Sequence, residues 1–476
     1  MYQTINIPEW IACRSYLTTT SESKTIISNN KLHKTILLEG LASDLYSFLS
    51  ENNSTSKEML IKYAEEHNLS EEINEFIEEL HSLKLIGFDT DSEDDYISSA
   101  LNYQKDAQEE NDGAIEDKLS KWVFSKGFLW SLFMELTYKC NLRCIHCYNP
   151  ANRGTTEISF EDAKKIIDDA VELGCFELTV SGGECTLDSD FLKIIEYARA
   201  KRLNLHIFTN GISLTQHPEM LKKIVKLYPY QVGISIYSSD KKLHETVTTI
   251  KDSFDKSIGV LSQLKNYGVN TQVKSVQLSE TVKTWKSTIE LAKKYDTSAA
   301  FDVTLTPTIE GDKKTWNHLL SDEDLIALYS NPESPLYVGG WSEPPAIDLN
   351  RDGPCFAGSH TVCINPNLNV VGCVSLPLVF GNLKNERLKD IWEKGQTDKD
   401  SVLYRWQHVL LKEWKDCFKE NYCRFCHFCP GMGMLEDKLF AKSEQLCHLA
   451  KLKMKVFYDL KDKKDIPYQN GVYLMK

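Results

Sequence analysis

The 476-residue sequence lacks the features that mark membrane, secreted and nucleic-acid-binding proteins. It contains no run of about 18 apolar residues, so no transmembrane helix is expected. The N-terminus, MYQTINIPEW, has neither the basic region nor the apolar core of a signal peptide. The net charge of −13 argues against a nucleic-acid-binding groove. We therefore expect a cytoplasmic protein that binds neither membranes nor nucleic acids.

Cysteine, in contrast, is abundant, and 14 cysteines in a reducing compartment point to metal or redox chemistry rather than to disulfides. Cys140, Cys144 and Cys147 have the spacing C-x3-C-x2-C directly after an apolar stretch. A [4Fe–4S] cluster usually takes four cysteine ligands. Three thiolates would leave one iron open to a further ligand, as in reactive metal sites. A zinc knuckle is the alternative interpretation.

This triplet resembles the cysteine motif of the radical S-adenosylmethionine (radical SAM) enzymes. The resemblance implies that SAM chelates the open iron through its amine and carboxylate. It also implies that an external one-electron donor, a flavodoxin or a ferredoxin, reduces the cluster. The reduced cluster then cleaves SAM to a 5′-deoxyadenosyl radical, which removes a hydrogen atom from the substrate. His146 occupies the position before the third cysteine, where the family usually has an aromatic residue.

From about residue 128 onward, strands and helices alternate, which predicts a parallel sheet. The radical SAM resemblance implies an α/β fold with a partial (β/α)6 TIM barrel over residues 119–345 and chemistry at the carboxyl ends of its strands. It further implies a set of SAM-binding residues in this core: His146, Gly182, Gly183, Glu184, Asn210 and Ser235. We expect the two glycines to let the backbone approach the ligand without a Cβ in the way.

Two positions near this pocket depart from the family pattern. Thr248 stands where an arginine commonly helps to hold the SAM carboxylate, and Lys251 is a candidate to replace that arginine as a point charge. Cys185 follows the Gly-Gly-Glu segment, where proline is usual. It is either a small buried thiol or a catalytic thiol that gives a hydrogen atom to a substrate radical, as in peptide epimerases of this superfamily.

Residues 346–476 contain eight further cysteines, enough for two [4Fe–4S] clusters with four ligands each. Their order resembles the SPASM extension of peptide-modifying radical SAM enzymes, which implies three clusters in the chain. By analogy, the first auxiliary cluster would use a first set of cysteines: Cys355, Cys363, Cys373 and Cys429. The second auxiliary cluster would use a second set: Cys417, Cys423, Cys426 and Cys447. Leu368 replaces the family's turn glycine, and zinc is the structural alternative.

Residues 1–90 predict a small α+β unit with two strands, three helices and a closing extended segment, a winged-helix-like arrangement. It resembles the leader-peptide recognition element of ribosomal-peptide maturation systems, similar to the small chaperone of pyrroloquinoline-quinone synthesis. That family adds the leader as an extra strand to an exposed sheet edge. A nucleic-acid-binding winged helix and a simple accessory domain are the alternatives. The acidic residues 91–118 predict a linker.

Together these features predict a radical SAM/SPASM maturase that binds a precursor peptide through its leader and forms a C–S or C–C crosslink in it. Within enzymes, the rival hypotheses are a peptide epimerase and a formylglycine-forming sulfatase maturase. The rival from another class is a non-catalytic iron–sulfur electron carrier or scaffold. That last hypothesis leaves the Gly-Gly-Glu segment and the three-cysteine motif unexplained.

Overall fold

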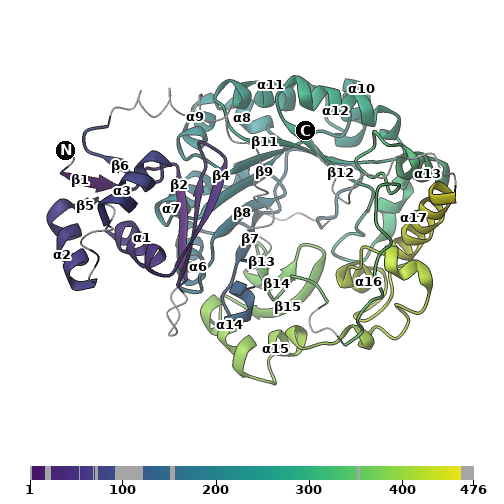
Figure 1. Cartoon of the computed structure of the whole chain (residues 1–476). Helices are drawn as coiled ribbons and strands as arrows, with labels where there is room; N and C mark the ends of the chain where they lie inside the picture. The colour runs from purple at the N-terminus through teal and green to yellow at the C-terminus, as the bar shows by residue number, and fades with distance from the viewer. Residues whose placement is uncertain are drawn as a thin grey trace.

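The fold is described from a computed structural model, which covers residues 3–16, 23–52, 54–67, 69, 73–91, 119, 122–150, 156–350 and 354–462. Apart from Asp91, the acidic linker predicted for 91–118 lies outside the described residues. A small N-terminal unit lies beside a curved sheet with helices on its outer face, and the C-terminal part lies at the opposite side of that sheet (Figure 1).

The N-terminal unit contains two small sheets and three helices. The antiparallel sheet β2-β3-β4 is formed by Ile11–Tyr16, Lys24–Asn29 and Lys34–Glu39, and the sheet β5-β1-β6 by Ser54–Ser56, Thr4–Asn6 and Gly87–Phe88. The helices are α1 (Leu41–Glu51), α2 (Lys57–His67) and α3 (Ile73–Ser82). Their apolar faces share one core with the strands, as the helical spacing of Ile73, Ile77 and Leu80 predicts.

The central part alternates strands with helices. Its strands are β7 (Ser131–Thr137), β8 (Glu177–Gly182), β9 (Asn204–Thr209), β10 (Gln231–Ser235), β11 (Thr271–Val276) and β12 (Ser298–Asp302). The helices are α6 (Phe160–Glu172), α7 (Phe191–Ala200), α8 (Ile212–Gln216), α9 (Pro218–Lys226), α10 (Lys241–Thr248), α11 (Ser253–Asn266), α12 (Trp285–Lys294) and α13 (Asp322–Ser330), with short 3-10 turns η1 (Cys185–Leu187), η2 (Val282–Thr284) and η3 (Lys313–His318).

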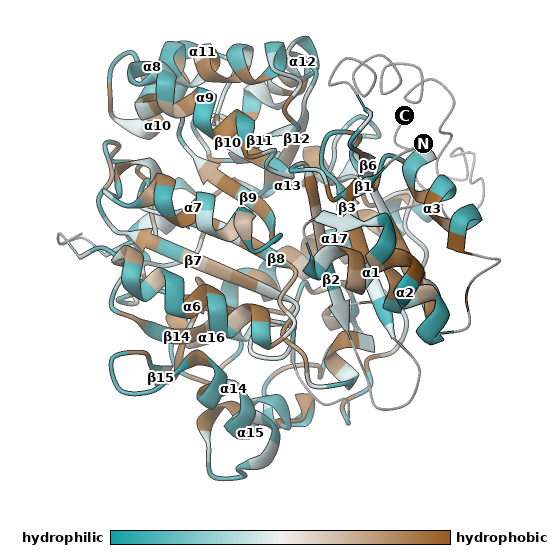
Figure 2. Ribbon diagram, turned by 90° about the vertical axis from the view of Figure 1, so that its left-hand side faces the viewer, coloured by the Kyte–Doolittle hydropathy of each residue, from teal (hydrophilic) through white to brown (hydrophobic). Residues whose placement is uncertain are grey.

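Helix α6 illustrates how local sequence specifies these elements. The Ser159 side chain accepts a hydrogen bond from the Asp162 backbone N–H and caps the first turn. Ala163, Ile166 and other apolar residues on one face are buried against the sheet. Gly174, at a φ of 85°, follows the last turn. Apolar residues run along the central strands, while the outer faces of the surrounding helices are largely hydrophilic (Figure 2).

The C-terminal part extends the same sheet. Its strands are β13 (Thr361–Ile364), β14 (Asn369–Cys373) and β15 (Leu376–Asn382), and its helices are α14 (Leu388–Thr397), α15 (Val402–Gln407), α16 (Pro430–Glu436) and α17 (Glu444–Asp462), with turns η4 (Leu411–Glu413) and η5 (Asn421–Phe425). Among the described residues the order is β12-β11-β10-β9-β8-β7-β13-β14-β15, parallel from β12 to β13 and antiparallel beyond. The cysteine-rich part is therefore joined to the core by strand pairing.

The six parallel strands of the core, each followed by a helix, confirm the predicted partial barrel. The sixth strand, β12, covers Ser298–Asp302. Beyond it the backbone leaves the sheet, because the Leu305 N–H and C=O are bonded by the Gln445 side chain of α17. In the part of the chain that the structure describes, no helix is long and apolar enough to cross a membrane.

The N-terminal unit is attached to the core through β2. The Cys13 N–H donates to the Arg202 carbonyl at 3.1 Å, and the Arg14 guanidinium donates to the Lys201 carbonyl at 3.0 Å. From the core, the buried Arg199 donates to the Glu9 carbonyl at 2.7 Å. One edge of the sheet β2-β3-β4 is thus covered by the loop after α7, while β4 is the terminal strand on the other edge.

Candidate functional site

The cysteine loop follows β7 at its carboxyl end. Cys140, Cys144 and Cys147 are all partly exposed. The Arg143 N–H donates to the Thr248 carbonyl at 3.1 Å, which fastens the middle of the loop to the end of α10. Among the described residues, no three His, Cys, Asp or Glu side chains are grouped around a single metal-ion position. In a cubane cluster each thiolate binds a different iron, so the motif does not require such a grouping.

The Gly-Gly segment after β8 is packed directly on the start of this loop. The Gly183 N–H donates to the Thr137 carbonyl at 2.7 Å. A Cβ on Gly182 would lie 2.4 Å from that carbonyl oxygen, and one on Gly183 would lie 2.3 Å from the Lys139 oxygen. The sequence suggested that these glycines clear space for a ligand. The structure shows a further reason, because the missing Cβ atoms also let two backbones touch.

The Glu184 side chain stabilises this contact between the two segments through hydrogen bonds. Its buried carboxylate accepts hydrogen bonds from the Thr186 hydroxyl at 2.6 Å, the Thr209 hydroxyl at 2.5 Å and the Asn210 N–H at 2.7 Å. Burial raises the pKa of Glu184, and these hydrogen bonds oppose the rise. Both carboxylate oxygens are engaged inside the protein, so a ligand contact from this segment would come from its backbone.

Asn210 connects the end of β9 to the cysteine loop. Its side-chain amide donates to Asn141 Oδ1 at 2.8 Å and lies 4.0 Å from Cys140 Sγ, while its Oδ1 accepts from the Ile212 N–H at 3.0 Å. Three sequence-predicted positions, Cys140, Glu184 and Asn210, therefore belong to one hydrogen-bonded cluster at the carboxyl ends of β7, β8 and β9.

Ser235 ends β10 near a second part of the cysteine loop. The buried Tyr237 hydroxyl is hydrogen-bonded to the side chains of Ser235 and Cys144. The Tyr237 backbone N–H donates to His244 Nδ1 at 3.3 Å, and burial lowers the pKa of His244 to about 4. His244 therefore acts as a neutral structural acceptor.

His146 is the one predicted site residue with a buried polar atom left without a partner in the described structure. Its ring lies 4.6 Å from the Tyr237 ring, and its Nδ1 is buried and unbonded. Burial lowers the pKa of His146 to about 4, with smaller effects from the nearby His318 and Glu280. This buried nitrogen within the cysteine loop is free to form a hydrogen bond with a ligand.

Lys251 and Cys185 fit their predicted roles less well. Lys251 lies exposed in the turn between α10 and α11. Cys185 is fully buried in the apolar core, where its thiol donates to the Phe208 carbonyl at 3.3 Å. Of the two interpretations of Cys185, this packing fits the small buried thiol better than the hydrogen-atom donor.

Glu135, on β7, is a site residue that sequence reasoning missed. It is 5% exposed, and its carboxylate accepts a hydrogen bond from the Tyr148 hydroxyl at 3.2 Å. Burial raises the pKa of Glu135 to about 7. The signal was available: Glu135 interrupts an apolar strand, and alternation along β7 turns it away from the helix-covered face that buries Met134 and Leu136.

Among the first set of C-terminal cysteines, Cys355, Cys373 and Cys429 lie close together. Burial raises the pKa of Cys373 to about 12, with a smaller contribution from Cys429 and another from Cys355. Cys363 is fully buried on β13, and its raised pKa reflects burial first, then the charges of Glu135 and Cys373. Cys363 therefore lies between the other cysteines of its set and the interior of the barrel.

The second set is grouped independently. Burial raises the pKa of Cys426 to about 12, with smaller contributions from Cys447, Cys423 and Cys417. Burial likewise raises the pKa of Cys417 to about 12, and the charge of Cys447 is the second largest cause of this rise. No member of the first set contributes to either value.

Leu368 lies at a φ of 64°, a backbone conformation that favours glycine. Its N–H donates to the Asn365 carbonyl at 2.8 Å and closes the turn between β13 and β14. The Leu368 side chain is 8% exposed within the main core. The turn of the family pattern is therefore kept, and burial of the leucine side chain offsets its strained backbone.

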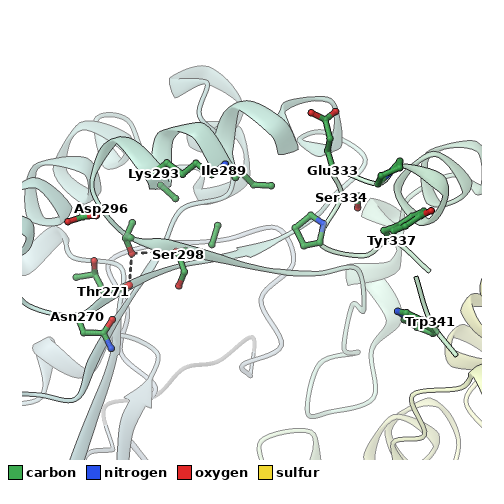
Figure 3. Close-up of a pocket in the computed structure, with 15 residues that line it drawn as sticks. Asn270, Thr271, Ile289, Lys293, Asp296, Ser298, Glu333, Ser334, Tyr337 and Trp341 are labelled. Carbon is green, nitrogen blue, oxygen red and sulfur yellow. Dashed lines mark hydrogen bonds between the residues drawn. The ribbon is translucent and has the colours of Figure 1, made fainter. Parts of the chain in front are cut away.

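A cavity of about 960 Å³ lies away from all these cysteines (Figure 3). It is at the amino-terminal ends of β11 and β12, next to α12 and the segment that follows α13. Residues that line it include Thr271, Lys293, Ser298, Glu333 and Trp341. In parallel α/β barrels the reacting groups lie at the carboxyl ends of the strands, so this cavity is not the candidate active site.

The residues present fit a [4Fe–4S] cluster that binds SAM at an open iron. Three partly exposed thiols stand on one loop whose backbone is fastened to its neighbours. Around the loop are the Asn210 amide, the Ser235 hydroxyl and the unbonded Nδ1 of His146, which are polar groups suited to a polar ligand. The eight C-terminal thiols in two groups likewise fit two further clusters.

Comparison with known proteins agrees with this chemistry. The Radical SAM superfamily matches residues 134–304, and the SPASM iron–sulfur cluster-binding domain matches residues 355–430. Mycofactocin maturase MftC of Mycolicibacterium smegmatis is 28% identical over 331 residues, covering 65% of this chain and 79% of the relative. The subtilosin biosynthesis protein AlbA of Bacillus subtilis is 25% identical over 328 residues, covering 67% and 70%.

Among solved structures, Streptococcus suis SuiB bound to its precursor peptide SuiA is similar with a TM-score of 0.50. The alignment covers 93% of this chain and 99% of SuiB at 15% sequence identity, and it therefore speaks for the fold alone. The chain belongs to the radical SAM enzymes with a SPASM domain, and its cofactors are SAM, a SAM-binding [4Fe–4S] cluster and auxiliary clusters in that domain.

Proposed function

We propose that this enzyme modifies a ribosomally made precursor peptide, held through its leader, by forming a C–S or C–C crosslink. The observation that carries the proposal is the N-terminal unit: one edge of its sheet β2-β3-β4 is fixed to the barrel, and the other edge, β4, is the terminal strand. A peptide leader can add to such an edge as a further strand. Two relatives are named as a maturase and a bacteriocin biosynthesis protein, and SuiB has a precursor peptide bound.

In this proposal the leader is bound by residues 1–90, and residues 91–118 form a linker to the catalytic core. The core comprises residues 119–345, and the auxiliary clusters are held by residues 346–476. SAM bound at the open iron would supply the radical chemistry that removes a hydrogen atom from the peptide. The chain's own residues hold that site in shape. Glu184 and Asn210 fasten the Gly-Gly segment to the cysteine loop, and Tyr237 connects Ser235 to Cys144.

We assign Cys140, Cys144 and Cys147 to the SAM-binding cluster and the first and second sets to one auxiliary cluster each. The separate grouping of the two sets supports this division. A flavodoxin or ferredoxin is the proposed one-electron donor. We place the enzyme in the cytoplasm, where its cysteines would stay reduced.

Two rival reactions are distinguished by particular residues. A peptide epimerase of this superfamily needs a thiol near the substrate, and the buried Cys185 is poorly placed for that role. A formylglycine-forming enzyme has no need of a leader-binding unit. We therefore favour crosslinking.

The test is anaerobic mass spectrometry of the reconstituted enzyme with reductant, SAM and the short precursor peptide encoded beside its gene. Crosslinking predicts 5′-deoxyadenosine and a peptide lighter by two hydrogens. A peptide unchanged in mass that gains one deuterium in heavy water would instead establish epimerisation. Absence of 5′-deoxyadenosine in all conditions would contradict the proposal.

A second measurement tests leader binding without any substitution. Hydrogen exchange of the backbone amides would be followed with and without the precursor peptide. Amides of β4 that point away from β3 should become protected, while those of β2 should not change, because β2 is already covered by the loop at 201–202. Unchanged exchange throughout Lys34–Glu39 would rule out strand addition at this edge.

A further inference from the structure

The interior of the barrel contains a lysine that the arrangement described above does not use. Lys274 on β11 is in register with Ser235 on β10. Register partners in a parallel pair direct their side chains to the same face. The Lys274 side chain lies across Gly233, and its ammonium is 4.5 Å from the centre of the Phe208 ring on β9.

Gly233 makes room for this side chain. A Cβ at position 233 would lie 3.2 Å from Lys274 Cε and 2.9 Å from the nearest atom of the Phe208 ring. Strand β10 thus carries no side chain where the lysine crosses it. The lysine is packed into the barrel on the same face as Ser235.

The ammonium of Lys274 has no carboxylate near it in the described part of the chain. Burial is the one cause that lowers the pKa of Lys274, and no acidic neighbour opposes it. The nearby His206 is uncharged at neutral pH, because burial and the Lys274 charge lower its pKa to about 4. Its Nε2 is buried without a hydrogen-bond partner among the described residues.

Two lysines on the outer surface of the same core, in contrast, have carboxylate partners. Lys241 lies 2.6 Å from an Asp255 carboxylate oxygen, and Lys201 lies 2.7 Å from one of Asp168. A partly desolvated cation without a counter-charge is unfavourable unless a ligand brings the counter-charge. The contrast indicates that the interior lysine is kept for a bound anion.

We propose that Lys274, which is in register with Ser235 and extends across Gly233, binds a carboxylate inside the barrel. The carboxylate belongs either to the methionyl part of SAM or to the peptide substrate. The family resemblance pointed to Lys251 as the cation of the site, but Lys251 is exposed on a turn, whereas Lys274 is on the strand next to Ser235. The inference rests on the proposed function only for the choice of ligands.

The test compares ligands that differ in their carboxylate. Binding of S-adenosylhomocysteine, which has the carboxylate, and of 5′-methylthioadenosine, which lacks it, would be measured by calorimetry on the anaerobically reconstituted enzyme. The variant is Lys274→Met, which removes the charge and keeps most of the volume. Lys223→Met, on the exposed face of α9, is the matched control.

If the carboxylate is that of SAM, Lys274→Met should weaken S-adenosylhomocysteine about tenfold to hundredfold, the range of a hydrogen bond to a charged group, and leave methylthioadenosine unchanged. If it is that of the substrate, neither nucleoside changes. The precursor peptide then binds more weakly by a similar factor, and the difference disappears for a peptide whose acidic residues are replaced by amides.

Unchanged binding of all three ligands would overturn the proposal, and so would an equal loss for the two nucleosides, which would indicate a damaged pocket. Failure of the wild-type enzyme to bind S-adenosylhomocysteine is a separate outcome that contradicts the assignment of SAM itself. Lys251→Met, measured in parallel, should bind every ligand like the wild type.

Discussion

The two sets of C-terminal cysteines lie in different surroundings. In the first set, the buried Cys363 is next to Glu135 of the barrel. In the second set, Cys447 is near the lysines at 442 and 451 of the exposed surface. The first set therefore borders the barrel interior and a buried carboxyl group. The second borders solvent and has two lysines near it, together with Asp416 and Glu436.

This difference suggests a division of labour between the two proposed auxiliary clusters. Positive charge near a cluster favours its reduced form, and negative charge disfavours it. An electron released by a substrate radical would pass from the first cluster to the second and then to an external carrier.

The largest expected effect is the difference between losing a ligand of the SAM-binding cluster and losing a ligand of an auxiliary cluster. Cys140→Ala should abolish 5′-deoxyadenosine formation, because it removes a ligand of the SAM-binding cluster. Cys447→Ala should still cleave SAM but release little crosslinked peptide. Product chromatography and iron analysis, with about twelve irons expected per wild-type chain, would check both. Equal loss of SAM cleavage in the two variants would contradict the division.

Gly183→Ala should displace the cysteine loop, since its Cβ would lie 2.3 Å and 2.5 Å from two backbone oxygens of residues 139 and 138. We expect a loss of about four irons and of SAM cleavage, with both auxiliary clusters retained. Gly259→Ala is the matched control, because nothing lies within 4 Å of its added Cβ. In helix α11 that change should be neutral or stabilise by about 0.5–1 kcal/mol. A fully loaded Gly183→Ala enzyme would refute this reason for the glycine.

Glu135 should make stability depend on pH beside the first set. Its pKa is about 7 in the folded protein against an ordinary 4.5. As pH rises from about 4.5 to about 7, the unfolded chain releases a proton that the folded protein keeps, so the folded state loses stability. The loss is at most about 3 kcal/mol.

Calorimetric Tm values of the anaerobic, reconstituted enzyme would test this between those pH values. Glu135→Gln should flatten that part of the profile. An identical pH profile in the wild type and the variant would show that Glu135 does not titrate in this window.

The lysines near the second set should raise the reduction potential of one cluster. Replacing Lys442 and Lys451 by Gln should lower that potential by roughly tens of millivolts, since both side chains are exposed and screened by solvent. Lys455→Gln, exposed farther along α17, is the control. Spectroscopic redox titration would locate the change, and a shift in the other auxiliary cluster would reverse the assignment.

The smallest effect concerns the turn before β14. Leu368→Gly would remove about 1–2 kcal/mol of backbone strain and lose a buried side chain worth about 1.5–3 kcal/mol. The net change should be a destabilisation of about 1 kcal/mol, read as a small fall in Tm. A clear rise in Tm would mean that the leucine side chain contributes little packing.

Much of this organisation could be predicted from the sequence, because it is encoded in short-range patterns. The strands of the barrel follow from alternation, and the cysteine loop and the glycines at 182 and 183 were identified through the resemblance to radical SAM enzymes. The reason for the glycines did not follow, since it depends on the backbone of Thr137–Lys139, which is distant in sequence.

The residues that the sequence analysis missed are those whose surroundings depend on the neighbouring strands of the sheet. Glu135 is a charge in the apolar strand β7, and Lys274 lies in the more polar strand β11. The register of the sheet places both on the face that lines the barrel interior. Cys185 was the opposite case: its position after a family motif suggested chemistry, but the fold buries it. The continuous pairing of β7 with β13 also joins segments more than two hundred residues apart.

The most direct test of the two-cluster account is a redox titration followed by electron paramagnetic resonance, with and without the precursor peptide. The account predicts two distinct auxiliary signals, and only the one lost in Cys373→Ala should change when peptide binds. The signal lost in Cys447→Ala should be unaffected. A peptide-dependent change confined to the second signal, or the loss of both signals in either variant, would contradict it.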